Sequence, residues 1–179
     1  MTVSRNHITC FACGCTTPDV QSETHPYMLS SPGCWAMFCE VLSREYADPR
    51  YAVVHNYTVD TYAIQHTGSK EDPRAVKSVN IHLASLYAIF YEGVLVNEAD
   101  TFKTRFSKYH KGRQDLIWLT PPAGRDHLNI SDLWKTNNVE AHSSMAEEWA
   151  RSAWNKWEHE HQRIAALVYE FFSNTSWPR

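Results

Sequence analysis

Apolar residues recur at spacings of three and four over most of the chain beyond residue 31, the spacing that gives a helix one apolar face. This pattern predicts five helices, each bounded by proline, glycine or a capping residue: about Pro32–Tyr46, Pro49–His66, Pro73–Glu92, Ala99–His110 and Asn138–Phe172. Ser31 is placed to cap the first of them, because its side chain can accept a hydrogen bond from the first helical turn. We therefore expect an all-α protein.

The segment before the first helix has no helical period. Residues 1–9 are expected to be a short extended lead-in, and the prolines and small polar residues of Cys10–Gly33 indicate a loop. A second irregular stretch begins at Leu116, and Ile130–Leu133 is expected to be a turn. With 179 residues and no long linker, the chain is expected to form one domain, 1–179. Within it, residues 1–33 would form a zinc-binding loop and residues 34–179 a bundle of about five helices.

Composition and charge narrow the function classes. The hydrophobic share is 43%, and an aromatic share of 13% with 7 Trp and 9 Tyr predicts a thick core. A net charge of −3 provides no field that would attract nucleic acid or an anionic membrane, so neither is an expected partner. There is no apolar run near the roughly 18 residues that span a bilayer, and the N-terminus lacks the apolar core of a signal peptide. We therefore expect a cytoplasmic protein.

All five cysteines fall between Cys10 and Cys39, with His25 among them. Inside cells, clustered cysteines are more often metal ligands than disulfides. The C-x2-C spacing of Cys10 and Cys13 lets one turn deliver two thiolates to one ion, and Cys34 falls in the first turn of a helix, where a thiolate is favoured. The sequence predicts that Cys10, Cys13, His25 and Cys34 bind one Zn²⁺. The role would be structural, because four protein ligands leave no position open for water.

Alternatives exist within this group. Cys15 could replace Cys13, and Cys39 could replace Cys34 as a ligand. Cys39 falls on the apolar face of the first predicted helix, so we interpret it as a small buried hydrophobic residue. The cysteines could also be reduced and unliganded, or Cys10, Cys13 and the spare Cys15 could form a thiol-based sensor of redox state or metal.

Histidines on the predicted helices suggest a second chemistry. His55 and His66 share one face of the second helix, while His82 and His161 lie in the apolar stripes of later helices. If three helices converge, His55 or His66 could meet His82 and His161 in an open metal site that activates water, with Asp60 as a general base. In the simpler interpretation, each histidine is a core residue satisfied by a neighbour, and Asp60 forms a buried ion pair.

Four motifs resemble a bacterial family known as a domain of unknown function: C-x-x-C, H-P-Y-M, S-P-G-C-W and V-H-x-x-x-V-D-x-Y-x-x-Q-H. The resemblance covers roughly residues 10–95, and Cys15 and Cys39 are not part of its pattern. It implies special roles, but no activity, for the matching positions: Cys10, Cys13, His25, Cys34, His55, Asp60, Gln65 and His66.

Three functions therefore remain open. The first is a protein with structural zinc that binds a small molecule or another protein. The second is a metal-dependent, hydrolase-like enzyme that uses the core histidines and Asp60, and the third is a thiol-based sensor. The sequence contains no phosphate-binding glycine loop, G-x-S-x-G or H-E-x-x-H motif, which argues against familiar nucleotide, serine hydrolase and zinc protease chemistry. It does not determine the substrate, partner or oligomeric state.

Overall fold

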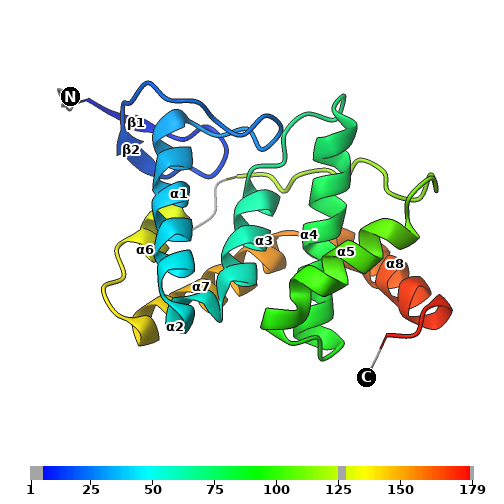
Figure 1. The fold of residues 1–179 in the computed structure, drawn as a ribbon. Coiled ribbons are helices and arrows are strands. Elements are labelled where there is room, and N and C mark those ends of the chain that lie inside the picture. The colour runs from blue at the N-terminus through cyan, green and yellow to red at the C-terminus, as the bar shows by residue number, and fades with distance from the viewer. Residues whose placement is uncertain (1–5, 125–127, 178–179) are drawn as a thin grey trace.

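A central helix, α3 (His55–Gln65), lies between two groups of helices (Figure 1). The computed structural model describes residues 6–124 and 128–177. Nine of the 11 residues in α3 are buried, polar ones included. The helix packs mainly against α4 (Pro73–Tyr91) and α7 (Val139–Lys156). Because polar side chains of α3 are buried on several sides, they must find partners inside the protein.

The other helices divide between the two sides of α3. On one side lie α1 (Pro32–Ala47), α2 (Pro49–Ala52) and α6 (Ile130–Trp134). On the other side α4 packs against α5 (Ala99–Tyr109) and α8 (His161–Asn174). Two short 3₁₀ turns complete the helical part, η1 (Val96–Glu98) and η2 (Glu158–Glu160). The all-α prediction is confirmed, with eight α-helices within the described residues rather than about five.

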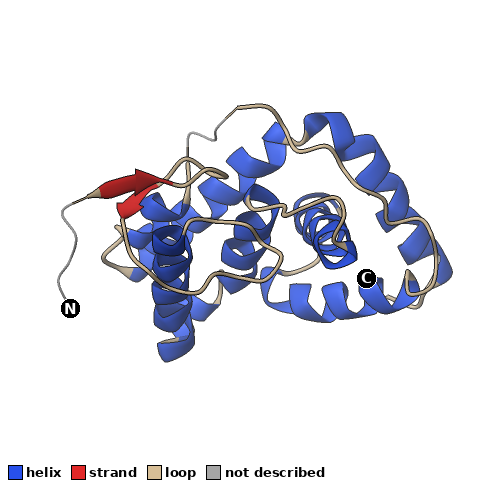
Figure 2. Ribbon diagram, turned by 90° about the horizontal axis from the view of Figure 1, so that it is seen from above, coloured by secondary structure: helices blue, strands red, loops and turns tan. Residues whose placement is uncertain are grey.

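The N-terminal segment forms a small antiparallel hairpin over one end of α1 (Figure 2). Its strands are β1 (His7–Thr9) and β2 (Thr16–Pro18). Between them, the N–H of Cys10 donates to the carbonyl of Cys15, and Gly14 adopts a positive φ of 81° that closes the turn. The expected extended lead-in agrees with β1, whereas the prediction of a loop was wrong for Thr16–Pro18, because a strand of three residues is too short to show an alternating pattern.

Two of the predicted helices are each broken in two. The predicted Pro49–His66 becomes α2 and α3, and the predicted Asn138–Phe172 becomes α7, η2 and α8. At the second break, His161 stacks on the ring of Trp154 with centroids 3.8 Å apart, and its Nε2 bonds the Trp154 carbonyl at 2.9 Å. Because the break depends on this contact, no proline or glycine marks it in the sequence.

Two further predictions concern smaller features. Residues 130–133, expected as a turn, belong to α6, which begins with a capping box formed by Asn129 and Asp132. The expected thick aromatic core is confirmed by Trp149, Trp154 and Trp157, each no more than 1% exposed. Among the described residues, we find no helix with the length and apolar character needed to cross a membrane.

Candidate metal centre

Four buried side chains from three segments meet where the hairpin covers the helices. Cys10 and Cys13 come from the hairpin turn, Cys34 from the first turn of α1, and His66 from the residue that ends α3. The three Sγ atoms and one ring nitrogen of His66 all lie within 4.8 Å of one another. Segments far apart in the sequence therefore present three soft ligands and one borderline ligand to a common point.

The spacing of these atoms fits a tetrahedral ion. The Sγ atoms of Cys13 and Cys34 are 3.7 Å apart, and His66 Nε2 lies 3.4 Å from Cys34 Sγ and 3.8 Å from Cys10 Sγ. With zinc bonds of about 2.3 Å to sulfur and about 2.0 Å to nitrogen, a tetrahedron has edges of about 3.8 Å between sulfurs and about 3.6 Å between sulfur and nitrogen. A disulfide would require about 2.0 Å, and the five cysteines are all free.

The orientation of His66 is set by its own helix. Its Nδ1 lies 2.7 Å from the carbonyl oxygen of Tyr62, and a carbonyl can only accept, so Nδ1 carries the proton. When the ring is neutral, the lone pair is on Nε2, the atom that faces the cysteines. The ring of Tyr62 stacks on that of His66 with centroids 3.9 Å apart, which further restricts the imidazole. Such support behind a ligating histidine is typical of metal sites.

Backbone N–H groups at the start of α1 add positive character. The N–H of Ser31 donates to Cys10 Sγ at 3.5 Å, and the Ser31 side chain caps the helix by accepting from the N–H of Cys34. The Cys34 thiol therefore sits at the positive end of the helix dipole. These donors partly offset the one net negative charge that three thiolates, an imidazole and a divalent ion would leave.

The close packing of the thiols shifts their pKa values in opposite directions. Hydrogen bonding, first with Cys13, lowers the pKa of Cys10 well below that of a free thiol. Hydrogen bonding with Cys10 raises the pKa of Cys34 far above its ordinary value. Burial lowers the pKa of His66, but hydrogen bonds with Cys10 and Cys13 raise it more, to about 9. Three thiolates this close together would repel one another, and a divalent ion in their midst would offset that repulsion.

His25, the predicted fourth ligand, is not part of the group, and His66 stands in its place. The Nδ1 of His25 accepts from the backbone N–H groups of Tyr27 and Met28 at 3.4 and 3.2 Å, so the imidazole serves a local turn. Its ring also packs against Trp35, with centroids 5.2 Å apart. The Q-H pair at the end of the second predicted helix marked His66 as special, but only the packing of α3 under the hairpin brings it to the cysteines.

The two spare cysteines differ. Cys15 is buried beside the other thiols, and hydrogen bonding with Cys10 raises its pKa, but it is not one of the four residues that converge within 4.8 Å. Cys39 is exposed, so the prediction that it is buried was wrong. The neighbouring Phe38 packs inward instead, stacked on Tyr62 with centroids 3.8 Å apart. Cys34, and not Cys39, is therefore a member of the converging group.

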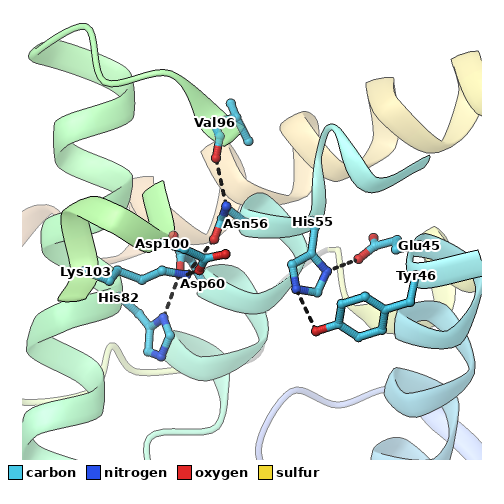
Figure 3. A network of polar contacts seen from close by, with 9 residues as sticks. All are labelled: Glu45, Tyr46, His55, Asn56, Asp60, His82, Val96, Asp100 and Lys103. Atoms are coloured by element: carbon cyan, nitrogen blue, oxygen red, sulfur yellow. Dashed lines mark hydrogen bonds and ion pairs between the residues drawn. The ribbon is translucent and has the colours of Figure 1, made fainter. Parts of the chain in front are cut away.

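The remaining candidate histidines do not converge, so the predicted three-histidine site is not formed. His55 Nδ1 bonds Glu45 at 2.7 Å, and His82 Nδ1 bonds Asp60 at 2.7 Å (Figure 3). His161 bonds the carbonyl of Trp154. Each is satisfied by a neighbour, as the simpler interpretation expected, and Asp60 is a buried carboxylate paired with a cation, Lys103, at 3.0 Å.

A second buried carboxylate, Glu45, went unnoticed in the sequence. Its two oxygens accept hydrogen bonds from His55 at 2.7 Å, from His142 at 2.9 Å and from the hydroxyl of Thr58 at 2.6 Å. Burial raises the pKa of Glu45, but the hydrogen bonds from His142 and then His55 outweigh it, so the net pKa is lowered. Glu45 follows Phe38 and Val41 at spacings of three and four, so its place on the buried face of α1 was the signal that the sequence offered.

Comparison with known proteins adds one match. A family model described as "Family of unknown function (DUF5946)" matches residues 8–158, a stretch that contains all four converging residues. This confirms the resemblance to a domain of unknown function. Neither a curated protein nor a solved structure matches the chain.

Proposed function

We propose a function from the site itself, because the chain belongs to the family of unknown function DUF5946 and inherits no activity from it. In this proposal, Cys10, Cys13, Cys34 and His66 bind one zinc ion whose role is structural. The observation that carries the proposal is the convergence of three sulfurs and one nitrogen within 4.8 Å, all on buried residues. Four protein ligands leave no coordination position for a substrate or a reacting water.

The choice of zinc follows from the ligand set. Three thiolates and one imidazole suit a soft or borderline ion with tetrahedral preference, whereas magnesium and calcium require oxygen ligands. The ion would connect the hairpin to α1 and α3. The hairpin itself consists of only two strands of three residues each. Since such a hairpin is marginal by itself, metal binding would supply much of the free energy that docks it.

A cavity next to the centre supports a binding role for the docked hairpin. Its volume is about 510 Å³, within the range of small-molecule sites, and its wall is shared by the hairpin, α1 and α6. Cys15 and Pro18 line it from the hairpin, Met37 from α1, and Trp134 from α6. We propose that this cavity binds a small molecule or a segment of a protein, and that zinc maintains it by holding one of its walls in place.

Metal analysis of matched variants tests the zinc site. Cys34→Ser and His66→Ala each remove one of the four converging atoms, while Cys39→Ser and His25→Ala remove the same residue types outside the group. Purified wild-type protein and the two controls should each contain one zinc per chain by plasma mass spectrometry. Cys34→Ser and His66→Ala should lose most of it. Equal zinc in all five proteins, or zinc lost only with His25→Ala, would refute the proposed ligand set.

A further inference from the structure

A second polar centre lies about α3 and does not involve the cysteines. Asp60 is fully buried, and its Oδ1 accepts a hydrogen bond from His82 Nδ1 at 2.7 Å (Figure 3). A carboxylate that is ionised can only accept, so the proton of the neutral imidazole is on Nδ1. The lone pair is then on Nε2, which is the arrangement of a carboxylate-oriented general base.

Asp60 does not need His82 to balance its charge. The ammonium of Lys103 lies 3.0 Å from the same carboxylate oxygen and is itself held by Asn56 Oδ1 at 2.7 Å and Asp100 at 3.1 Å. Burial raises the pKa of Asp60, but the charge of Lys103 and the hydrogen bond from His82 lower it more. With the ion pair already formed, the hydrogen bond to His82 has the effect of orienting the imidazole.

The free edge of that imidazole opens onto a cavity. His82 has a side chain 17% exposed and lines a cavity of about 360 Å³. No hydrogen bond to its Nε2 is present among residues 6–124 and 128–177, and Figure 3 shows that atom turned away from Asp60. The other lining residues are Tyr27, Arg74, Lys77, Ser78, Ile81 and Ser107.

The lining of this cavity is positive and contains no carboxylate. Arg74 is paired with Asp72 at 2.7 Å and lies over the ring of Tyr27, so its position is fixed from two sides. Lys77 takes part in no ion pair within the part of the chain that the structure describes. Burial lowers the pKa of His25, and the positive charge of Arg74 lowers it further.

We infer that this cavity binds a small organic anion, a carboxylate or a phosphate, that carries a hydroxyl group beside its charge. Lys77 and Arg74 attract the anionic group, and His82 Nε2 accepts a hydrogen bond from the hydroxyl. The ligand hydroxyl keeps its proton and donates it in a hydrogen bond to Nε2, while Nδ1–H of the same ring donates to Asp60, so the proposal is one of binding and orientation.

Histidine-detected NMR on the full chain, used as purified, tests this inference. Four probes are titrated: lactate, propionate, glycerol 3-phosphate and inorganic phosphate. They separate carboxylate from phosphate and hydroxylated from plain anions. We expect the ring signals of His82 to shift in a saturable way with at least one hydroxylated probe, more strongly than with its plain counterpart. No saturable shift with any probe would overturn the site, and equal affinity for hydroxylated and plain anions would overturn the role of Nε2.

Variants add a second readout. Lys77→Gln should weaken binding by about tenfold, the loss expected for one charged hydrogen bond. Lys70→Gln is the control, because Lys70 is an exposed lysine next to the same helix but outside the cavity. If the two variants bind alike, Lys77 does not hold the anion.

Asp60→Asn tests whether Asp60 positions the His82 ring, since the ¹⁵N shifts of that ring should report a changed tautomer. An unchanged tautomer would deny Asp60 that role.

This inference is independent of the zinc proposal. The cavity is lined by α4, α5 and the Tyr27 loop and contains none of the four converging residues. Zinc content is measured in each variant alongside ligand binding. A variant that loses anion binding but keeps its zinc tests the anion site alone, because its zinc site is intact.

Discussion

His66 and Tyr62, one turn apart in α3, are joined by a 2.7 Å hydrogen bond from the Nδ1 of the histidine to the carbonyl of the tyrosine. This bond determines which nitrogen faces the cysteines. The same carbonyl also accepts a hydrogen bond from the backbone N–H of His66 at 3.1 Å, so both the main chain and the side chain of His66 are bonded to Tyr62. The residue that ends α3 is therefore both a helix cap and the fourth member of the converging group.

Cys15→Ser tests whether the spare thiol belongs to the ligand set. Cys15 is buried beside the cluster but is not among the four atoms that converge, so the variant should keep one zinc per chain. Cys10→Ser should lose it, because Cys10 Sγ is 3.8 Å from His66 Nε2. Zinc content after exhaustive dialysis checks both. Zinc lost from Cys15→Ser and kept by Cys10→Ser would exchange the roles of the two cysteines.

Gly33→Ala should separate the hairpin from α1. A Cβ at Gly33 would collide with the carbonyl of Pro18 and the side chain of Thr17, both in β2. Overpacking of this kind costs about 1–3 kcal/mol, and here it also moves the segment that carries Cys10 and Cys13. We expect a lower midpoint of thermal unfolding and faster zinc loss to a chelator.

Gly112→Ala is the comparison for that variant. Gly112 has a positive φ of 81° but no atom near its Cβ position, so the substitution adds backbone strain without a collision. It should lower stability while leaving the rate of zinc loss unchanged. If Gly33→Ala also leaves that rate unchanged, the hairpin does not depend on close contact with α1.

Lys103→Met should be strongly destabilising. Lys103 is the cation beside Asp60, which is 0% exposed, and removing it leaves a buried charge without its ion pair. Breaking a buried pair in this way costs about 3–5 kcal/mol. Lys108→Met, at an exposed position of the same helix, is the control. Denaturant unfolding measures both. Adding Asp60→Asn to Lys103→Met should restore part of the loss, and no recovery would show that the lysine acts through packing alone.

The stability of the protein should depend on pH through Glu45. Its pKa is lowered in the folded state, so its contribution is present above the ordinary value of 4.5 and is lost as the pH falls through the lowered pKa. Glu45→Gln removes that contribution. The difference in unfolding free energy between wild type and variant should therefore shrink as the pH falls below 4.5. A difference that stays constant down to the acid transition would mean that Glu45 does not titrate with folding.

Much of the fold could be predicted from spacing alone. Val79, Leu83 and Leu86 repeat with the helical period, and each is buried in α4, whose ends match the predicted ones within a residue. What could not be predicted depends on contacts between segments. The break between α7 and α8 is stabilised by His161 packed on Trp154, and neither residue is a helix breaker in sequence.

Three of the four residues that converge, Cys10, Cys13 and Cys34, were among the zinc ligands proposed from the sequence, and His66 was not. Cys10, Cys13 and Cys34 follow local rules, a C-x2-C turn and a helix N-terminus. His25 lies between Cys13 and Cys34 in sequence, but its ring nitrogen already accepts from the backbone of the turn at residues 25–28. His66 is 32 residues beyond Cys34 and reaches it only through the packing of α3, which no local pattern encodes.

X-ray absorption at the zinc edge of the purified protein tests the central claim most directly, because it counts the atoms bound to the metal. We expect three sulfur ligands at about 2.3 Å and one nitrogen ligand at about 2.0 Å. His66→Ala should remove the nitrogen contribution, and His25→Ala should leave the spectrum unchanged. A metal-free protein, or a first shell of oxygen and nitrogen without sulfur, would contradict the proposed centre.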